Sequence, residues 1–399
     1  MVIPILLITI AILASAFVYI WRKEICSKSP TAQNAYKCFA WFLPGVIVAY
    51  ILFGLIHKGP MPHWFNAALA IYILLFLLTS VWVVAIALGI WFDGGNGRKV
   101  WRTIAIVICS IVTLTVLYGS LWERKQLVVK RVELNYTNLP ESFDGVTIAL
   151  FSDIHLSSMY GSHRMVEKMV DTINSLNADI AVFAGDLVTG TTNELTPEFA
   201  DLLDSIRARY GTFSVLGNHD MGIYGDTLRV PRATAISKLT EKQHQMGWRL
   251  LRNEYQTISS ENGEQIAIVG VDYPEEILEH SHRSTTLAED YNGVFSTLPD
   301  SLFRITIAHA PQMWDGLREL ARQDLTLSGH VHAMQMKLFG TSPARLFYKR
   351  WSGLYEENGE RLYITDGIGS VVIPARIGAP PELTLITLRS EKLVFAIND

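Results

Sequence analysis

Residues 146–155 read VTIALFSDIH, an apolar run that ends in an Asp-x-His motif. A short run rich in β-branched and aromatic residues is typical of a buried strand. Amphipathic segments such as His163–Leu176 and Glu198–Arg207 alternate with further runs of this kind: Ile180–Ala184, Phe213–Leu216, Ile266–Val271, Ile305–Ala308 and Leu325–Ser328. The alternation predicts an α/β layered domain.

Five of these six runs are followed by side chains that can bind metal ions. In chain order these are Asp153 and His155, Asp186, Asn218 with His219 and Asp220, His309, and His330 with His332. Because ligands bind just beyond the carboxyl ends of strands in α/β sheets, we expect these side chains to meet at one edge. A glycine directly precedes three of these candidate ligands, at Gly185, Gly217 and Gly329. Glycine allows the chain to turn sharply and to approach a bound group closely. Each motif alone is more often a turn or a cap. Their succession predicts one metal site.

The chain before residue 123 has a different character. It contains four uncharged apolar runs: Val2–Trp21, Phe39–Ile56, Ala67–Phe92 and Thr103–Leu121. Each is about long enough to cross a hydrocarbon core of ~30 Å as a helix, and tryptophans lie near the run ends, as in interfacial belts. The first run lacks the basic start of a signal peptide. The pattern favours a transmembrane helical bundle over buried helices of a soluble core.

Charge separates the same two parts. Residues 1–122 carry a net charge of +6 and the rest of the chain −10. We therefore expect a transmembrane region at 1–122, a connector at 123–145 and a catalytic domain at 146–399. The composition gives no reason to expect a nucleic-acid partner, which requires a clustered basic surface. All three cysteines lie before residue 123, which excludes a disulfide framework or a cysteine-based zinc site from the α/β part.

Basic residues predict the orientation of the membrane part. The segments after the first and third runs carry Arg22, Lys23, Lys28 and Lys37, and Arg98, Lys99 and Arg102, whereas only Lys58 lies between the second and third. The positive-inside rule then predicts a multi-pass protein of the cytoplasmic membrane with an extracytoplasmic catalytic domain. Four basic residues after the last run oppose this orientation: Arg124, Lys125, Lys130 and Arg131.

The series D-x-H, G-D, G-N-H-D, H and G-H-x-H resembles the motifs of the calcineurin-like metallophosphoesterase superfamily. Further stretches resemble sequences of its membrane-associated bacterial branch, typified by YkuE proteins. These stretches are Leu251–Glu254, Asp324–Gln335 and Tyr363–Leu388. The resemblance covers the chain from Val146 onward. It implies a layered α/β fold with two central mixed β-sheets flanked by helices. This branch often has two glycines where the chain has Ala333 and Met334, which puts the local loop shape in question.

The resemblance also implies roles for the candidate residues. A first metal ion would be bound by Asp153, His155, Asp186 and His332, and a second by Asp186, Asn218, His309 and His330, with Asp186 bridging. Imidazoles with carboxylate and amide oxygens suit Mn, Fe or Zn, and two such divalent ions can together activate a hydroxide and neutralise a phosphoryl group. His219 would stabilise the transition state or protonate the leaving oxygen. Asp220 would either orient His219 or cap a turn.

We therefore expect metal-dependent hydrolysis of a phosphodiester or pyrophosphate bond, on a lipid-linked substrate near the membrane. Two alternatives stay open: a broad-range phosphodiesterase whose anchor only sets its location, and a non-catalytic membrane scaffold or sensor. The segment Met221–Met246, with Arg229, Arg232 and Lys238, is either a lid over a phosphate group or a solvated helix.

Overall fold

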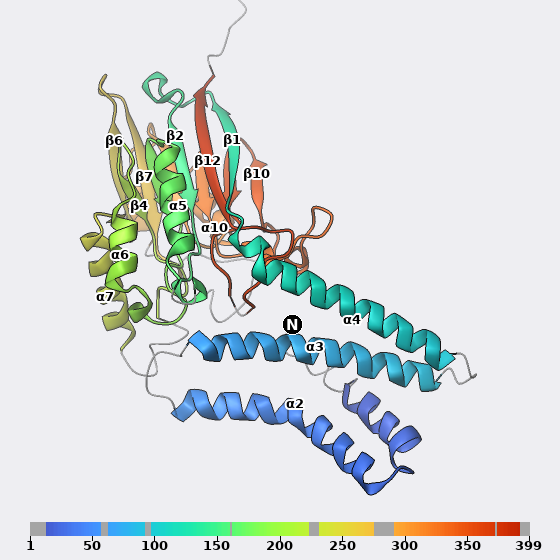
Figure 1. Cartoon of the computed structure of the whole chain (residues 1–399). Coiled ribbons are helices and arrows are strands. Elements are labelled where there is room, and N and C mark those ends of the chain that lie inside the picture. Colours follow the sequence, from blue (N-terminus) through green and yellow to red (C-terminus); the bar gives the residue numbers. More distant parts are fainter. Residues whose placement is uncertain are drawn as a thin grey trace, which may run out of the picture. The chain divides into compact units, whose positions relative to one another are not determined.

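The computed structural model describes residues 13–56, 63–91, 97–159, 162–222, 231–274, 291–371 and 373–391. It divides into two compact units, Met1–Ser120 and Leu121–Val371 with Ala375–Asp399 (Figure 1). Each unit is described by itself below. Most of the predicted run Val2–Trp21 lies outside the described residues, as does Arg229.

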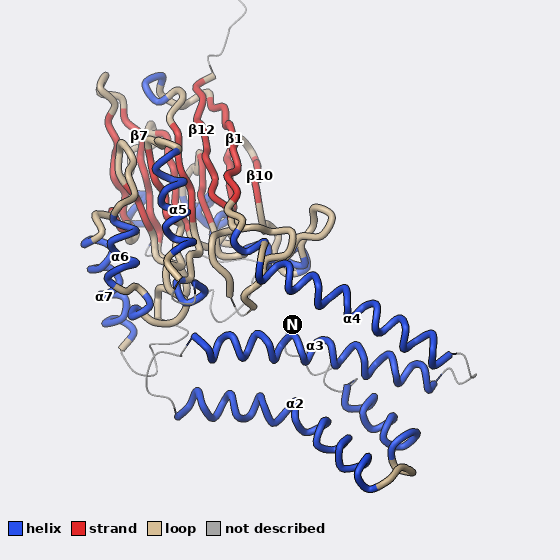
Figure 2. The backbone as a smooth tube through the Cα atoms, viewed as in Figure 1, coloured by secondary structure: helices blue, strands red, loops and turns tan. Residues whose placement is uncertain are grey.

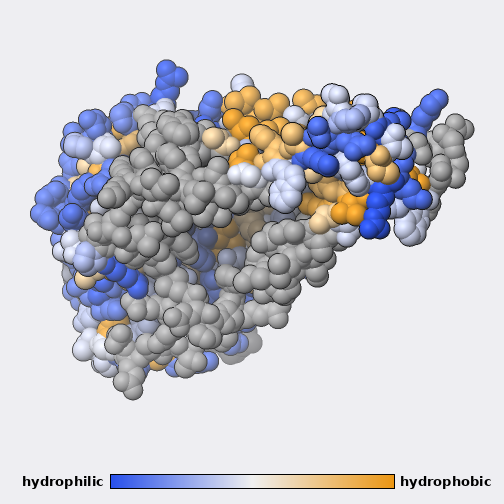
Figure 3. Space-filling view, turned by 90° about the horizontal axis from the view of Figure 1, so that it is seen from below, coloured by the Kyte–Doolittle hydropathy of each residue, from blue (hydrophilic) through white to orange (hydrophobic). Residues whose placement is uncertain are grey.

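The first unit is helical. Residues 13–20 form a helix that is followed by α2 (Pro30–Ile56), α3 (His63–Trp91) and α4 (Gly97–Leu121). Two of the described helical stretches, Leu74–Trp91 and Lys99–Lys125, are long and apolar enough to cross a membrane. Apolar side chains are exposed along α4, and hydrophobic residues gather over these helices in Figure 3. Because extended exposed apolar surface is unfavourable in water, these helices indicate association with a membrane.

The second unit contains two six-stranded sheets among its described residues. The first has the order β1 (Val128–Tyr136), β12 (Glu382–Ser390), β2 (Thr147–Phe151), β3 (Ile180–Phe183), β4 (Thr212–Ser214), β5 (Arg249–Leu250). The second has the order β10 (Gly353–Glu357), β11 (Glu360–Ile364), β9 (Leu325–Ser328), β8 (Phe303–Ala308), β7 (Gln265–Val271), β6 (Glu254–Ser259). Both sheets are mixed, and all six predicted strands are present, as β2, β3, β4, β7, β8 and β9.

Alternation along β2 shows how the layers pack. Ile148 and Leu150 are buried in the cluster between the two sheets, whereas Ala149 and Phe151 belong to a cluster on the opposite face. That second cluster includes Val166, Met169, Val170 and Ile173 of α5 (Arg164–Ser175), together with residues of α6 (Pro197–Asp204) and α7 (Arg232–Gln245). Helices α9 (Asn292–Thr297) and α10 (Met313–Leu320) contribute to the same cluster from the second sheet. The second unit is therefore an α/β layered fold with helices outside two packed sheets (Figure 2).

Strand direction positions the candidate residues. β2, β3 and β4 are parallel in the first sheet, and β7, β8 and β9 are parallel in the second. The loops that follow β2, β3, β4, β8 and β9 carry all the candidate side chains, and we call the edge at which these five strands end the site edge. Ligand-bearing loops that lie far apart in the chain thus converge there.

The segment 123–145 differs from the predicted connector. It contains β1, which pairs in parallel with β12 along nine residues, from Val128 opposite Glu382 to Tyr136 opposite Ser390. Leu134 and Tyr136 are buried between the sheets, while Arg131 and Glu133 are exposed. The strand was missed because it lies at the edge of the sheet, where charged residues interrupt the apolar pattern.

Substitutions in β1 test this assignment. Leu134 is 2% exposed, so Leu134→Ala should lower the free energy of unfolding by about 2–5 kcal/mol. Its neighbour Glu133 forms a solvent-exposed ion pair with Arg389, so Glu133→Ala should change stability by less than about 1 kcal/mol. Denaturant unfolding of both variants measures the difference. Equally small effects would mean that this segment is only a connector.

Candidate metal centre

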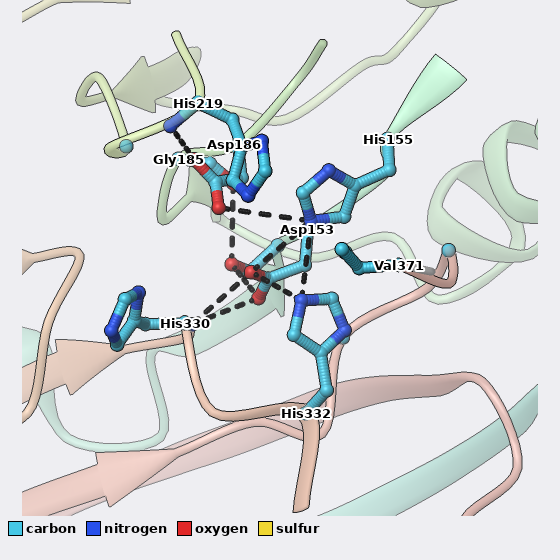
Figure 4. Close-up of polar contacts among 12 residues, drawn as sticks. Asp153, His155, Gly185, Asp186, His219, His330, His332 and Val371 are labelled. Atoms are coloured by element: carbon cyan, nitrogen blue, oxygen red, sulfur yellow. Dashed lines mark hydrogen bonds and ion pairs between the residues drawn. The ribbon is translucent and has the colours of Figure 1, made fainter. Parts of the chain in front are cut away.

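The first group of candidate ligands joins the loops after β2 and β9. His332 Nε2 lies 3.1 Å from Asp153 Oδ1 and 3.2 Å from His155 Nε2. The three side chains are buried, and one donor atom from each lies within 4.8 Å of the others. The backbone N–H of His330 donates to both carboxylate oxygens of Asp153, at 3.1 Å each (Figure 4). The two sheets are therefore tied together at this carboxylate.

The second group is built around Asp186. Its Oδ2 lies 3.1 Å from His309 Nε2, and His330 completes a group of donor atoms within 4.8 Å. Asn218 Oδ1 lies 3.1 Å from His309 Nε2 and 2.8 Å from His330 Nδ1.

Asp186 also faces the first group. The same Oδ2 is 3.7 Å from His155 Nε2, and Asp186, His155 and His219 form a third cluster of donor atoms. Figure 4 shows Asp186 between His219 and Asp153. One carboxylate is thus within reach of both ligand groups, as a bridging ligand would have to be.

Backbone carbonyls fix two imidazole rings. His309 Nδ1 lies 2.7 Å from the carbonyl oxygen of Ala184, and His219 Nδ1 lies 2.5 Å from that of Thr189. Because a carbonyl only accepts, Nδ1 must carry the proton in each ring, which leaves Nε2 for the site. His219 is half-buried, whereas His155 and His309 are fully buried. A substrate can therefore reach His219 more readily than these ligand candidates.

Five candidate residues occupy the left-handed region of backbone conformation. Their φ values are 56° for Asp153, 46° for His155, 61° for Asp186, 72° for His330 and 51° for His332. Such conformations are unfavourable for residues with a side chain and concentrate at functional sites. Ala333 and Met334, which replace glycines common in similar sequences, also have φ 49°. The left-handed turn therefore persists here without glycine.

Gly217 is required for space. A Cβ atom there would overlap the carboxylate of Asp186 and the backbone nitrogen of Asp186. The close approach expected from the glycine before Asn218 is thus present, and it lets the loops after β3 and β4 touch.

Asp220 binds backbone amides. Its Oδ2 accepts from the N–H groups of Asp186 and Gly217 at 2.7 and 3.0 Å, and its Oδ1 from those of Leu187 and Val188 at 2.9 and 3.1 Å. Of the two roles expected for Asp220, this geometry favours the turn cap. The carboxylate holds the loop after β3 against the loop after β4.

Glu194, which was not among the residues predicted from the sequence, also binds backbone amides. Its two carboxylate oxygens accept N–H groups from Ser157, Thr189, Gly190 and Thr191 at 2.8 to 3.1 Å. Thr189 is the residue whose carbonyl holds His219. Glu194 closes a capping box with Thr191, and the pattern Thr-x-x-Glu could have identified it from the sequence.

A buried guanidinium next to the centre was also missed. Arg376 is fully buried, donates to the carbonyls of Gly369 and Ala379, and lies 3.5 Å from His332 Nδ1. No local motif marks it, because its partners come together only in the folded chain.

The electrostatics suit bound cations. Burial would raise the pKa of Asp186, but His309 and His219 hold it well below its usual range. Burial opposes protonation of His309, yet Asp186 raises the pKa of His309 to about 9. Burial and then the charge of His309 lower the pKa of His330 to about 3. The ionised Asp186 and the neutral His330 are in the forms that bind metal, whereas His309 must release a proton to do so. The thiolate-free donor set fits Mn, Fe or Zn.

The segment Met221–Met246 is only partly described. Its helical part is α7, which begins at Arg232, and the Arg232 Nε donates to the carbonyl of Met221 at 2.9 Å. Lys238 is exposed on α7. The lid stays a prediction.

Residues 146–334 match the family model described as calcineurin-like phosphoesterase. The metallophosphoesterase YkuE of Bacillus subtilis is 32% identical over 259 residues, which cover 63% of this chain and 82% of that protein. The transmembrane protein with metallophosphoesterase domain of Danio rerio is 25% identical over 402 residues, which cover 93% and 86% of the two chains. The UDP-2,3-diacylglucosamine pyrophosphatase LpxG of Chlamydia trachomatis is 26% identical over 319 residues, which cover 70% and 94%.

Asp220→Asn tests the turn cap. The new amide group would face two backbone N–H donors, so the free energy of unfolding should fall by about 1–3 kcal/mol. The affinity for Mn²⁺ should fall by about 10–100-fold, because the loop that carries Asp186 loosens. Denaturant unfolding and calorimetric titration with Mn²⁺ measure the two effects. Asp171→Asn, on the exposed face of α5, is the matched control. Wild-type Mn²⁺ affinity in the Asp220 variant would contradict this role.

Proposed function

The chain belongs to the calcineurin-like phosphoesterase family, whose members hydrolyse phosphoester bonds, and we propose that its catalytic unit hydrolyses a phosphodiester or pyrophosphate with two divalent metal ions. The observation that carries this proposal is the position of Asp186, which faces both ligand groups. A carboxylate within reach of both groups can bridge two metal ions.

The proposed ligands are those that the loops bring together. Asp153, His155, Asp186 and His332 would bind the first ion, and Asp186, Asn218, His309 and His330 the second. The close approaches of their donor atoms support both sets. The ions themselves would be Mn, Fe or Zn.

Two divalent cations would polarise a water molecule and offset the charge of the phosphoryl group. Side chains of the protein would supply the proton donor and hold the loops in position. The carbonyl of Thr189 orients the His219 ring through Nδ1, and in the doubly protonated ring Nε2 would donate a proton to the leaving oxygen or a hydrogen bond to the transition state. Asp220 and Glu194 keep the loops that carry Asp186 and Thr189 in place.

Catalysis can be tested with a chromogenic diester. The purified protein with Mn²⁺ should hydrolyse bis-p-nitrophenyl phosphate. His219→Ala should lower kcat by about 10²–10⁴-fold while bound metal stays constant, and Asp186→Asn should lower both activity and bound metal.

His244→Ala is the matched control, because His244 is exposed on α7 and belongs to none of the metal clusters among the described residues. It should leave kcat unchanged. Metal binding without hydrolysis of any ester would favour a membrane scaffold or sensor.

The substrate proposed here is a lipid-linked phosphate. The chain has two candidate membrane spans, and its relative LpxG is named for a lipid substrate, UDP-2,3-diacylglucosamine. A membrane anchor keeps the metal centre close to the bilayer, so the centre meets a substrate that resides in the bilayer more often than a soluble one. We further propose that all four apolar runs span the membrane and that the catalytic unit is extracytoplasmic, which protease accessibility of the C-terminus in intact spheroplasts tests.

A substrate panel separates a lipid-linked substrate from a broad range. Lipid-linked diphosphates in vesicles should be hydrolysed with a kcat/KM at least tenfold higher than soluble nucleotides by the full-length protein. A fragment without the membrane part should lose most of this preference, since it is no longer held at the bilayer. Equal rates on both substrate classes would favour a broad-range phosphodiesterase whose anchor only sets its location.

A further inference from the structure

The chain enters the second unit at the site edge. β2 ends there, and β12 runs antiparallel to β2, so β12 begins there. β1 is parallel to β12, with Val128 opposite Glu382, and the Val128 N–H donates to the carbonyl of Pro381 at 2.9 Å. The candidate membrane span Lys99–Lys125 ends only three residues before Val128. The chain that follows the last candidate span therefore enters the second unit at the site edge.

Contacts of the entering segment support this placement. Arg124 Nη1 lies 3.4 Å from the carbonyl of Ser158, in the turn η4 (Leu156–Met159) directly after His155. Lys168 Nζ donates to the carbonyl of Lys125 at 3.2 Å. Trp122, at the start of the second unit, is 61% exposed. Exposed tryptophan followed by cations is typical of a membrane interface.

An exposed apolar loop lies at the same edge. It comprises residues 334–346, which follow the ligand candidate His332, and we call it the apolar loop. Leu338 is 50% exposed, Phe339 fully exposed and Leu346 70% exposed. The N–H of Leu338 donates to the carbonyl of Thr341 at 2.8 Å and that of Thr341 returns to Leu338 at 3.1 Å. Phe339 is thus presented at the tip of a closed turn, where burial would recover about 1.5–3 kcal/mol for each large apolar side chain.

Hydrogen bonds on both sides of the tip fix the apolar loop beside the centre. The hydroxyl of Ser342 donates to the carbonyl of Ala333 at 2.6 Å, and Lys337 N–H donates to the carbonyl of Ile377 at 2.7 Å. Beyond the loop, the Tyr348 ring lies 6.2 Å from the His330 ring, between centroids. Figure 1 shows these orange loops at the end of the sheets where β1 begins.

Charge complements the apolar side chains. Arg345 is exposed within the apolar loop, and Lys349, whose side chain is 60% exposed, lies just beyond it and forms an ion pair with Asp315 at 3.2 Å. Apolar side chains flanked by cations match the boundary between acyl chains and phosphate headgroups.

We propose that the site edge faces the bilayer and that Leu338 and Phe339 insert into its headgroup region. The occupant of the apolar loop is then the lipid surface itself. This proposal rests on the membrane attachment of the proposed function, and not on the chemistry of the centre. It implies that a lipid-linked phosphate reaches the metal ligands without leaving the interface.

The test uses the full-length protein in phospholipid vesicles. Cys26, Cys38 and Cys109 are replaced by serine, which can keep the hydrogen bonds that Cys26 and Cys109 donate to carbonyls. Phe339→Cys then carries an environment-sensitive fluorophore. The matched control is Glu261→Cys, in the turn between β6 and β7 at the opposite edge, where the Glu261 side chain is 88% exposed.

The label at position 339 should show blue-shifted emission and at least threefold stronger quenching by lipids with brominated acyl chains than the label at 261. Equal, water-like emission at both positions would overturn the proposal. A blue shift that brominated lipids do not quench, and that fades as protein is diluted in lipid, would assign the loop to a second copy of the chain and also overturn it. Hydrolysis of bis-p-nitrophenyl phosphate, measured on the same vesicles, reports separately on the proposed function.

Discussion

The carboxylate of Asp220 organises the centre without entering it. Four backbone N–H groups from two loops converge on this one side chain. Burial, followed by the charge of Asp186, raises the pKa of Asp220 to about 7, while the amides act in the opposite direction. Because the Asp186 N–H is among the four, the hydrogen bonds fix a residue that adopts a left-handed conformation. The position of the shared carboxylate therefore depends on Asp220.

Each of the two sheets contributes part of the set of candidate ligands. The first sheet supplies Asp153, His155, Asp186 and Asn218, and the second supplies His309, His330 and His332. The two groups proposed for the metal ions each combine both sheets, since His332 meets Asp153 and His309 meets Asp186 across the gap between them. The apolar cluster between the sheets thus sets the distances in the centre. A buried carboxylate or imidazole without such a partner would be costly.

The site edge carries both the candidate ligands and the start of β1, where the chain enters the second unit. β1 and β12 both begin at this edge, beside the loops that carry the candidate ligands. Just before β1, Arg124 contacts the loop after β2. A phosphoesterase with a membrane anchor could hold its centre far from the lipid, at the end of a linker. Here Arg124, near the end of the candidate span, lies 3.4 Å from the carbonyl of Ser158 in the loop after β2.

The sequence by itself determined six of the twelve strands of the described residues, and the candidate residues that follow them. Apolar runs of strand length and the polar groups after them are local patterns, so β2, β3, β4, β7, β8 and β9 could be predicted, as could the convergence of Asp153, Asp186 and His309. Tertiary structure alone decided what depends on distant pairing. β1 is a strand because β12 lies beside it, and its charged edge conceals this in the sequence. The geometry favours a cap role for Asp220, because its carboxylate accepts N–H groups from residues 32 to 34 positions earlier as well as from Gly217.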